Sequence, residues 1–138
     1  MPLMDLPRME PREAAMLNPL QLAYMGDSVW EMIVRNRLIL QRRNVHHMHT
    51  ECVRTVNAGA QAQAMRLLQP FLTEEEKAIV LRGRNAHAKH PSPRNQDPAD
   101  YSESTGFEAL LGFLYLTGSE ERLKELVEII FGKDEPYA

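Results

Sequence analysis

The sequence predicts an all-α fold in a single domain. No segment alternates polar and apolar residues with a period of two, and none gathers β-branched residues between turn signals. Apolar residues instead recur at helical spacing, between residues typical of helix starts and stops. The length of 138 residues fits one compact domain, and a composition of 43% hydrophobic and 25% charged residues excludes wholly disordered and fibrous chains.

The chain is expected to divide into an N-terminal arm, residues 1–17, and a main domain, residues 18–138. The arm is rich in proline and acidic residues, which favours an extended segment or a short helix. The domain opens with Asn18 as a helix N-cap, a proline at the first helical position and Gln21 placed to return a capping bond. The helix that follows, to about residue 41, is apolar on nearly all sides. It must therefore be central or be shared with a second subunit.

Further helices are predicted at residues 45–68, 73–84, 102–116 and 120–131. The clearest start is the capping-box pattern Thr73-x-x-Glu76. Residues 83–100 are rich in Gly, Asn, His and Pro, so we expect a long loop there. Loops of this length inside compact domains are usually functional or disordered.

Several protein classes are excluded at this point. The longest apolar stretch, residues 20–34, is interrupted by polar side chains and is too short to span a bilayer. The N-terminus lacks a basic segment followed by an apolar one, so we expect a cytoplasmic protein. The single Cys52 excludes an intramolecular disulfide and a Cys-rich zinc site, and we expect it to be a small buried residue.

The charge is unevenly distributed along the chain. Residues 32–94 carry a net charge of +7, whereas residues 95–138 carry −7. Within the basic block, residues 77–94 hold five Lys or Arg residues and no carboxylate. This pattern suits a polyanionic partner, and a solvated basic loop is an equal alternative on charge alone.

Two acidic residues stand in apolar surroundings. Asp27 lies in the middle of the first long helix and has no cation one turn away, whereas Glu31 can pair with Arg35 at i,i+4. Glu108 lies in a second apolar helix, where it could close a capping box with Thr105 or project as a free carboxylate. Carboxylates from two facing helices would form an oxygen site of the kind that Mg²⁺ prefers. Beside a basic loop, such a site indicates phosphodiester chemistry.

Four segments together resemble the Mini-ribonuclease III family. They are residues 18–31 (NPLQLAYMGDSVWE), 56–62 (VNAGAQA), 82–86 (RGRNA) and 101–116 (YSESTGFEALLGFLYL). The resemblance implies a homodimeric, all-helical, Mg²⁺-dependent endonuclease that cleaves double-stranded RNA and trims 23S ribosomal RNA precursors. A large-subunit ribosomal protein is a further expected partner. The alternative reading is a non-catalytic, dimeric RNA-binding or ribosome-assembly factor.

The resemblance also assigns residues. Asp27 and Glu108 become the catalytic residues and Mg²⁺ ligands, with Glu31 as a group that orients water near the ion. The basic segment becomes the RNA-binding surface, through Arg82, Arg84, Asn85, Lys89 and Arg94. A cluster of histidines, His46, His47 and His49, has no accompanying Cys or His for zinc and is expected at the surface or on RNA.

The chain departs from full-length ribonuclease III at two positions, because Ala23 and Thr105 stand where that enzyme has acids. Two of four metal-site carboxylates are therefore absent, as is general in the Mini family. A separate departure is Ser102, where a basic residue is expected after the Tyr. For the dimer, the apolar first helix predicts that Trp30 lies in or beside a subunit interface of roughly 2,000 Å² or more.

Overall fold

The computed structural model describes residues 6–86 and 97–132. These ranges contain helices and no strand, which confirms the predicted all-α class. Within these ranges, no helix is both long enough and apolar enough to cross a membrane. The elements are α1 (Pro11–Ala15), α2 (Pro19–Leu40), α3 (Val45–Val56), α4 (Ala58–Leu68), a 3₁₀ turn (Gln69–Phe71), α5 (Glu74–Asn85), α6 (Pro98–Leu116) and α7 (Glu120–Phe131).

Local capping explains why the long helices begin where the sequence predicts. The Asn18 side chain accepts a bond from the Leu20 amide at 2.9 Å, and the Gln21 side chain accepts one from the Asn18 amide at 3.2 Å. The Thr73 and Glu76 side chains make the same reciprocal pair at the start of α5. Both capping boxes are therefore confirmed.

The expected helix at residues 45–68 is wrong, because the chain breaks at Asn57. This residue is extended, with φ −71° and ψ 163°. Its side-chain oxygen accepts from the Ala60 amide at 2.8 Å, which caps α4. Its side-chain nitrogen donates to the carbonyls of Val53 and Arg54, which ends α3. One asparagine thus terminates one helix and starts the next.

The expected loop at residues 83–100 is shorter than predicted at both ends. Helix α5 continues to Asn85, and α6 begins at Pro98, where a missing N–H costs nothing. Residues 87–96 lie outside the described part of the chain. Because α6 starts early, Thr105 is inside the helix and its hydroxyl donates to the Tyr101 carbonyl at 3.0 Å. The Thr105–Glu108 capping box is therefore wrong.

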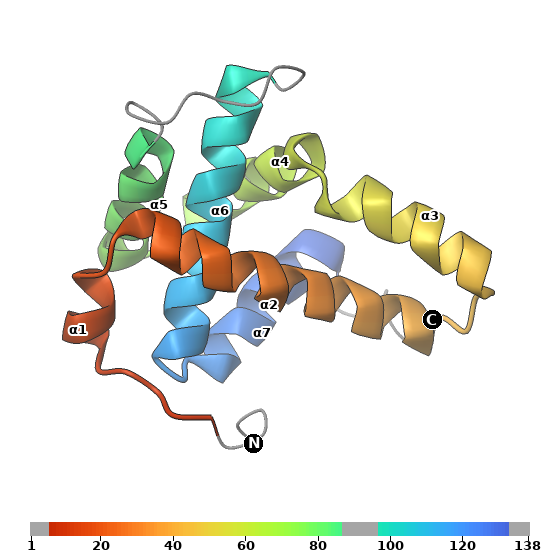
Figure 1. Cartoon of the computed structure of the whole chain (residues 1–138), viewed down its shortest axis with the longest axis horizontal. Helices are drawn as coiled ribbons and strands as arrows, with labels where there is room; N and C mark the ends of the chain where they lie inside the picture. Colours follow the sequence, from red (N-terminus) through yellow and green to blue (C-terminus); the bar gives the residue numbers. More distant parts are fainter. Residues whose placement is uncertain (1–5, 87–96, 133–138) are drawn as a thin grey trace.

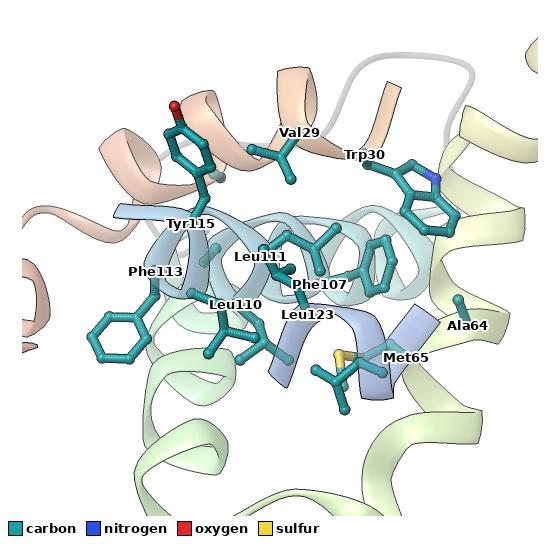
Figure 2. Packing of buried hydrophobic residues seen from close by; sticks show 14 of the residues in the cluster. Val29, Trp30, Ala64, Met65, Phe107, Leu110, Leu111, Phe113, Tyr115 and Leu123 are labelled. Carbon is teal, nitrogen blue, oxygen red and sulfur yellow. The ribbon is translucent and has the colours of Figure 1, made fainter. Parts of the chain in front are cut away.

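Helix α6 runs through the middle of the domain, with α2 crossing in front of it and α4, α5 and α7 around it (Figure 1). The core includes an aromatic cluster at the middle of α6, where Trp30 lies beside Phe107 (Figure 2). Trp30 meets Phe107 edge-on at 5.0 Å and stacks on Phe131 at 5.4 Å. The expected subunit interface in or beside Trp30 stays a prediction, and Trp30 itself is 1% exposed in the single chain. Its own helices cover it.

The N-terminal segment packs onto the domain. The Met9 amide donates to the Leu116 carbonyl at 2.7 Å, and Ala14 is fully buried. The Arg82 guanidinium on α5 donates to the carbonyls of Ala15 and Leu17, between α1 and α2. Residues 9–17 therefore contribute to the packing of the core.

Two glycines allow α2 and α6 to cross in backbone contact. A Cβ atom on Gly26 would overlap the Glu108 carbonyl oxygen, and one on Gly112 would overlap the Leu22 carbonyl oxygen. Real side chains cannot occupy that space unless a backbone moves. The crossing therefore depends on glycine at both positions.

We expect Gly26→Ala to destabilise the protein by more than about 3 kcal/mol, because the added methyl meets backbone rather than a movable side chain. The matched control is Gly59→Ala on α4, where the nearest atom to the new Cβ is at an ordinary 3.5 Å. That variant should be as stable as wild type or up to about 1 kcal/mol more stable. Urea unfolding followed by circular dichroism measures both, and equal stabilities would contradict the proposed close crossing.

Candidate active site

The side chains of Asp27 and Glu108 come from the two crossing helices. Gly26 lies against the Glu108 carbonyl, so the residue that follows it, Asp27, is placed beside the acid on α6. The two carboxyl groups are within hydrogen-bonding range of each other. Asp27 lies on the exposed side of α2, whereas Glu108 is half-buried. The structure thus brings together the two acids that the sequence singles out, at a place that a large substrate can reach.

The environment of Glu108 favours its neutral form. Burial is the largest effect that raises the pKa of Glu108, and Asp27 raises it further through its charge and through a hydrogen bond. A hydrogen bond from Gln61 acts in the opposite direction, and the net result is a pKa of about 8 instead of 4.5. At neutral pH the neutral form of Glu108 is therefore favoured.

A divalent cation fits this pair of carboxylates. Its charge would offset the effects that raise the pKa of Glu108 and allow that group to ionise. Among the described residues, no group of three or more His, Cys, Asp or Glu side chains is placed to hold a metal. The carboxylates of Asp27 and Glu108 would therefore supply the protein ligands, with water and substrate phosphate completing the coordination in the manner usual for Mg²⁺.

Glu31 lies one turn beyond Asp27 on α2 and is engaged by a neighbour on the same helix. Its carboxylate accepts from the Arg35 guanidinium at 2.6 Å, on the solvent-exposed side of α2. The i,i+4 pair that the sequence predicts is therefore present.

The structure adds Gln61 to the site, a residue for which the sequence predicts no role there. It lies on α4 and is 2% exposed. Its side-chain nitrogen donates to the Val56 carbonyl at 3.0 Å and to Glu108 Oε2 at 3.4 Å. The sequence feature that could have indicated this role is a polar residue between two alanines near the end of the 56–62 motif.

Comparison with known proteins identifies the family. Residues 20–119 match the Ribonuclease III domain. Mini-ribonuclease 3 of Symbiobacterium thermophilum is 49% identical over 113 residues, covering 81% of this chain and 86% of that protein. Mini-ribonuclease 3 of a Thermoanaerobacter species is 43% identical over 114 residues, covering 82% and 80%. The chain belongs to the Mini-ribonuclease III branch of the ribonuclease III family. It is an endoribonuclease.

A solved structure agrees with this assignment. A crystal structure of a Fusobacterium nucleatum protein superposes with a TM-score of 0.76 at 30% identity, covering 83% of this chain and 92% of that one. The all-helical arrangement described above is therefore shared with an experimentally determined relative. As a Mini-ribonuclease III, the chain carries the Asp27–Glu108 pair inside the segment that matches the Ribonuclease III domain.

The residues that the resemblance assigns to RNA have different surroundings in this Mini-ribonuclease III. Arg84 pairs with Glu103 of α6 at 2.7 Å, and Asn85 is exposed at the end of α5. Lys89 and Arg94 lie outside the described residues. Arg82 instead braces the α1–α2 junction through the two carbonyls named above, so the structure gives it a role in the fold.

The raised pKa of Glu108 predicts how the stability of the metal-free protein depends on pH. Between pH 4.5 and pH 8 the folded state binds more protons than the unfolded state, so stability falls as pH rises through this window. Glu108→Gln should remove most of this fall, which is on the order of a few kcal/mol. Urea unfolding in EDTA at pH 5, 7 and 9 measures it. The exposed Glu121→Gln serves as the control and should keep the wild-type dependence.

Proposed function

We propose that this endoribonuclease is Mg²⁺-dependent and hydrolyses phosphodiester bonds of double-stranded RNA. The observation that carries the proposal is the Asp27–Glu108 pair, in which two carboxyl groups from different helices lie close enough for the charge of Asp27 to raise the pKa of Glu108. Such a pair has the oxygen ligands and the excess negative charge that attract a divalent cation. Membership of the Mini-ribonuclease III family supports the same reading.

Asp27 and Glu108 would hold the ion between α2 and α6. A bound Mg²⁺ would polarise the phosphoryl group, lower the pKa of the attacking water and stabilise charge on the leaving oxygen. Glu108 must lose its proton for this, which gives the enzyme a link between pH and metal binding. Glu31, next along α2, would orient water on the open side once Arg35 releases it. No side chain acts as the nucleophile.

The RNA would be recognised mainly by shape. The major groove of A-form RNA is too narrow for side chains to read, so contacts go to phosphates and ribose hydroxyls. Arg84 and Asn85, at the end of α5, would contact phosphates together with Lys89 and Arg94. Arg84 is held against α6 by its ion pair with Glu103.

The proposal includes a homodimer that processes 23S ribosomal RNA precursors in the cytoplasm, with a large-subunit ribosomal protein as a further partner. Exposed apolar side chains on α2 support the dimer. Tyr24 is 84% exposed and Ile39 is 61% exposed, and Met32 and Leu40 are also exposed. A second copy of the chain would cover them, as obligate dimer interfaces are rich in apolar residues.

The first test removes one ligand charge at a time. Asp27→Asn and Glu108→Gln change little volume, so each should lower duplex cleavage by more than about 100-fold while leaving the fold and the oligomeric state unchanged. Labelled double-stranded RNA, with and without Mg²⁺, is the substrate, and single-stranded RNA is run beside it. Glu121→Gln is the matched control and should cleave normally. Cleavage by Glu108→Gln at the wild-type rate would refute the site, and duplex binding without cleavage by the wild type would favour the non-catalytic alternative.

A second test separates RNA positioning from chemistry. Replacing Arg84, Lys89 and Arg94 with Ala removes up to three phosphate contacts, so the slope of log affinity against log salt should flatten by up to about 2–3 units. Binding is measured in EDTA to prevent cleavage, on duplexes of different sequence, which should lose affinity equally. Lys124→Ala, on α7, is the control. An unchanged slope would mean that this segment is a solvated surface and would move the RNA path to the side of Arg35 and Arg54.

A further inference from the structure

The end of α3 is held to the active-site helices by side chains. The last four carbonyl groups of a helix have no partner within it. In α3 the first two of these, on Val53 and Arg54, accept from the Asn57 side chain. The Thr55 carbonyl accepts from the Trp30 indole at 3.4 Å. The last, on Val56, accepts from Gln61 at 3.0 Å.

Gln61 connects this helix end to the acidic pair. A backbone carbonyl can only accept, so the nitrogen of the Gln61 amide must face Val56. The same nitrogen then presents its other hydrogen to Glu108 Oε2 at 3.4 Å. A buried amide is costly unless it is hydrogen-bonded, and at 2% exposure Gln61 makes both bonds inside the protein. The amide is therefore fixed in one orientation, with a donor aimed at the carboxyl group.

We propose that Gln61 is a positioning residue that fixes the orientation of the Glu108 carboxylate for metal binding. This inference rests on the proposed function, because it assigns Glu108 to the metal. The contact comes from α4, which lies outside the crossing of α2 and α6, and its fixed point is the Val56 carbonyl. Val56 is the last residue of α3, so its carbonyl has no partner within the helix and is available to hold the Gln61 side chain.

The effect expected from Gln61 follows from its chemistry. A donor held against one carboxylate oxygen limits rotation of the group and leaves it oriented before the ion arrives. A bond to an ionised carboxylate is shorter and stronger than one to a neutral group, so the 3.4 Å contact should tighten when Glu108 ionises on metal binding. Partners of this kind typically contribute 10- to 100-fold to metal affinity or activity.

The test compares two ways of disturbing the same junction. Gln61→Met has a similar length and no donor, so it loses the bonds to both Val56 and Glu108. Asn57→Ala loses bonds to Val53, Arg54 and Ala60 but does not touch Glu108. The affinity for Mg²⁺ alone is obtained from the rise in the unfolding temperature with Mg²⁺ concentration. The same variants are then assayed for kcat and KM on a duplex across Mg²⁺ concentrations.

We expect Gln61→Met to weaken Mg²⁺ binding by about 10- to 100-fold and to raise the Mg²⁺ concentration needed for half-maximal cleavage by a similar factor. The KM for RNA at saturating Mg²⁺ should stay within about twofold. Asn57→Ala should lower the unfolding temperature, because it removes a helix cap, while keeping Mg²⁺ affinity within about twofold of wild type. Equal losses of Mg²⁺ affinity in both variants would show a merely structural role and overturn the proposal.

Two further variants keep the outcome decisive. If Gln61→Met does not fold, Gln61→Asn replaces it, because an amide one methylene shorter cannot span the acceptors on α3 and α6 together. Wild-type Mg²⁺ affinity in the folded Gln61 variant refutes the positioning role. Glu108→Gln tests the proposed function separately: if it binds Mg²⁺ as the wild type does, the metal is elsewhere and the proposed function fails. If only the Gln61 variant is unaffected, the proposed function stands.

Discussion

The backbone contact between α2 and α6 is the constraint on which the rest of the molecule depends. Glycine at positions 26 and 112 lets the two helices approach until a carbonyl of each fills the space of a missing Cβ. The residue after Gly26 is Asp27, and the Gly26 position meets the backbone of Glu108. The packing of α2 on α6 therefore also brings Asp27 and Glu108 together. A looser crossing would also separate the carboxyl groups.

The raised pKa of Glu108 has a consequence for the stability of the metal-free protein. Burial and the proximity of Asp27 raise this pKa, so ionisation of Glu108 destabilises the folded state. The surrounding core offsets this cost, with Trp30, Phe107 and Phe131 packed together nearby. Local destabilisation at a functional site, supported by packing elsewhere, is the pattern expected for such sites.

The features that could be predicted from the sequence depend on neighbours in the chain. Capping boxes such as Asn18–Gln21 join residues three apart, so their sequence pattern is sufficient. The apolar face around Trp30 does not reveal whether α6, α7 or another chain covers it, and in the structure Phe107 of α6 and Phe131 of α7 pack against Trp30. The role of Gln61 depends on its contacts with Val56 and Glu108, and Glu108 is 47 residues away in the sequence. No local pattern encodes that contact.

The surroundings of Ala23 and Thr105, where the resemblance places further acids in full-length ribonuclease III, fit the proposal that Asp27 and Glu108 alone hold the ion. Ala23 and Thr105 are both nearly inaccessible, and the Thr105 hydroxyl is bonded to the Tyr101 carbonyl within α6. A carboxylate at either place would be a buried charge close to Glu108, whose pKa is already raised by burial and by Asp27. Ala23 and Thr105 are therefore part of the core, and under the proposal metal binding depends on how Asp27 and Glu108 are oriented. A neutral donor such as Gln61 can orient a carboxylate without adding negative charge, which is the kind of partner that this site can accommodate.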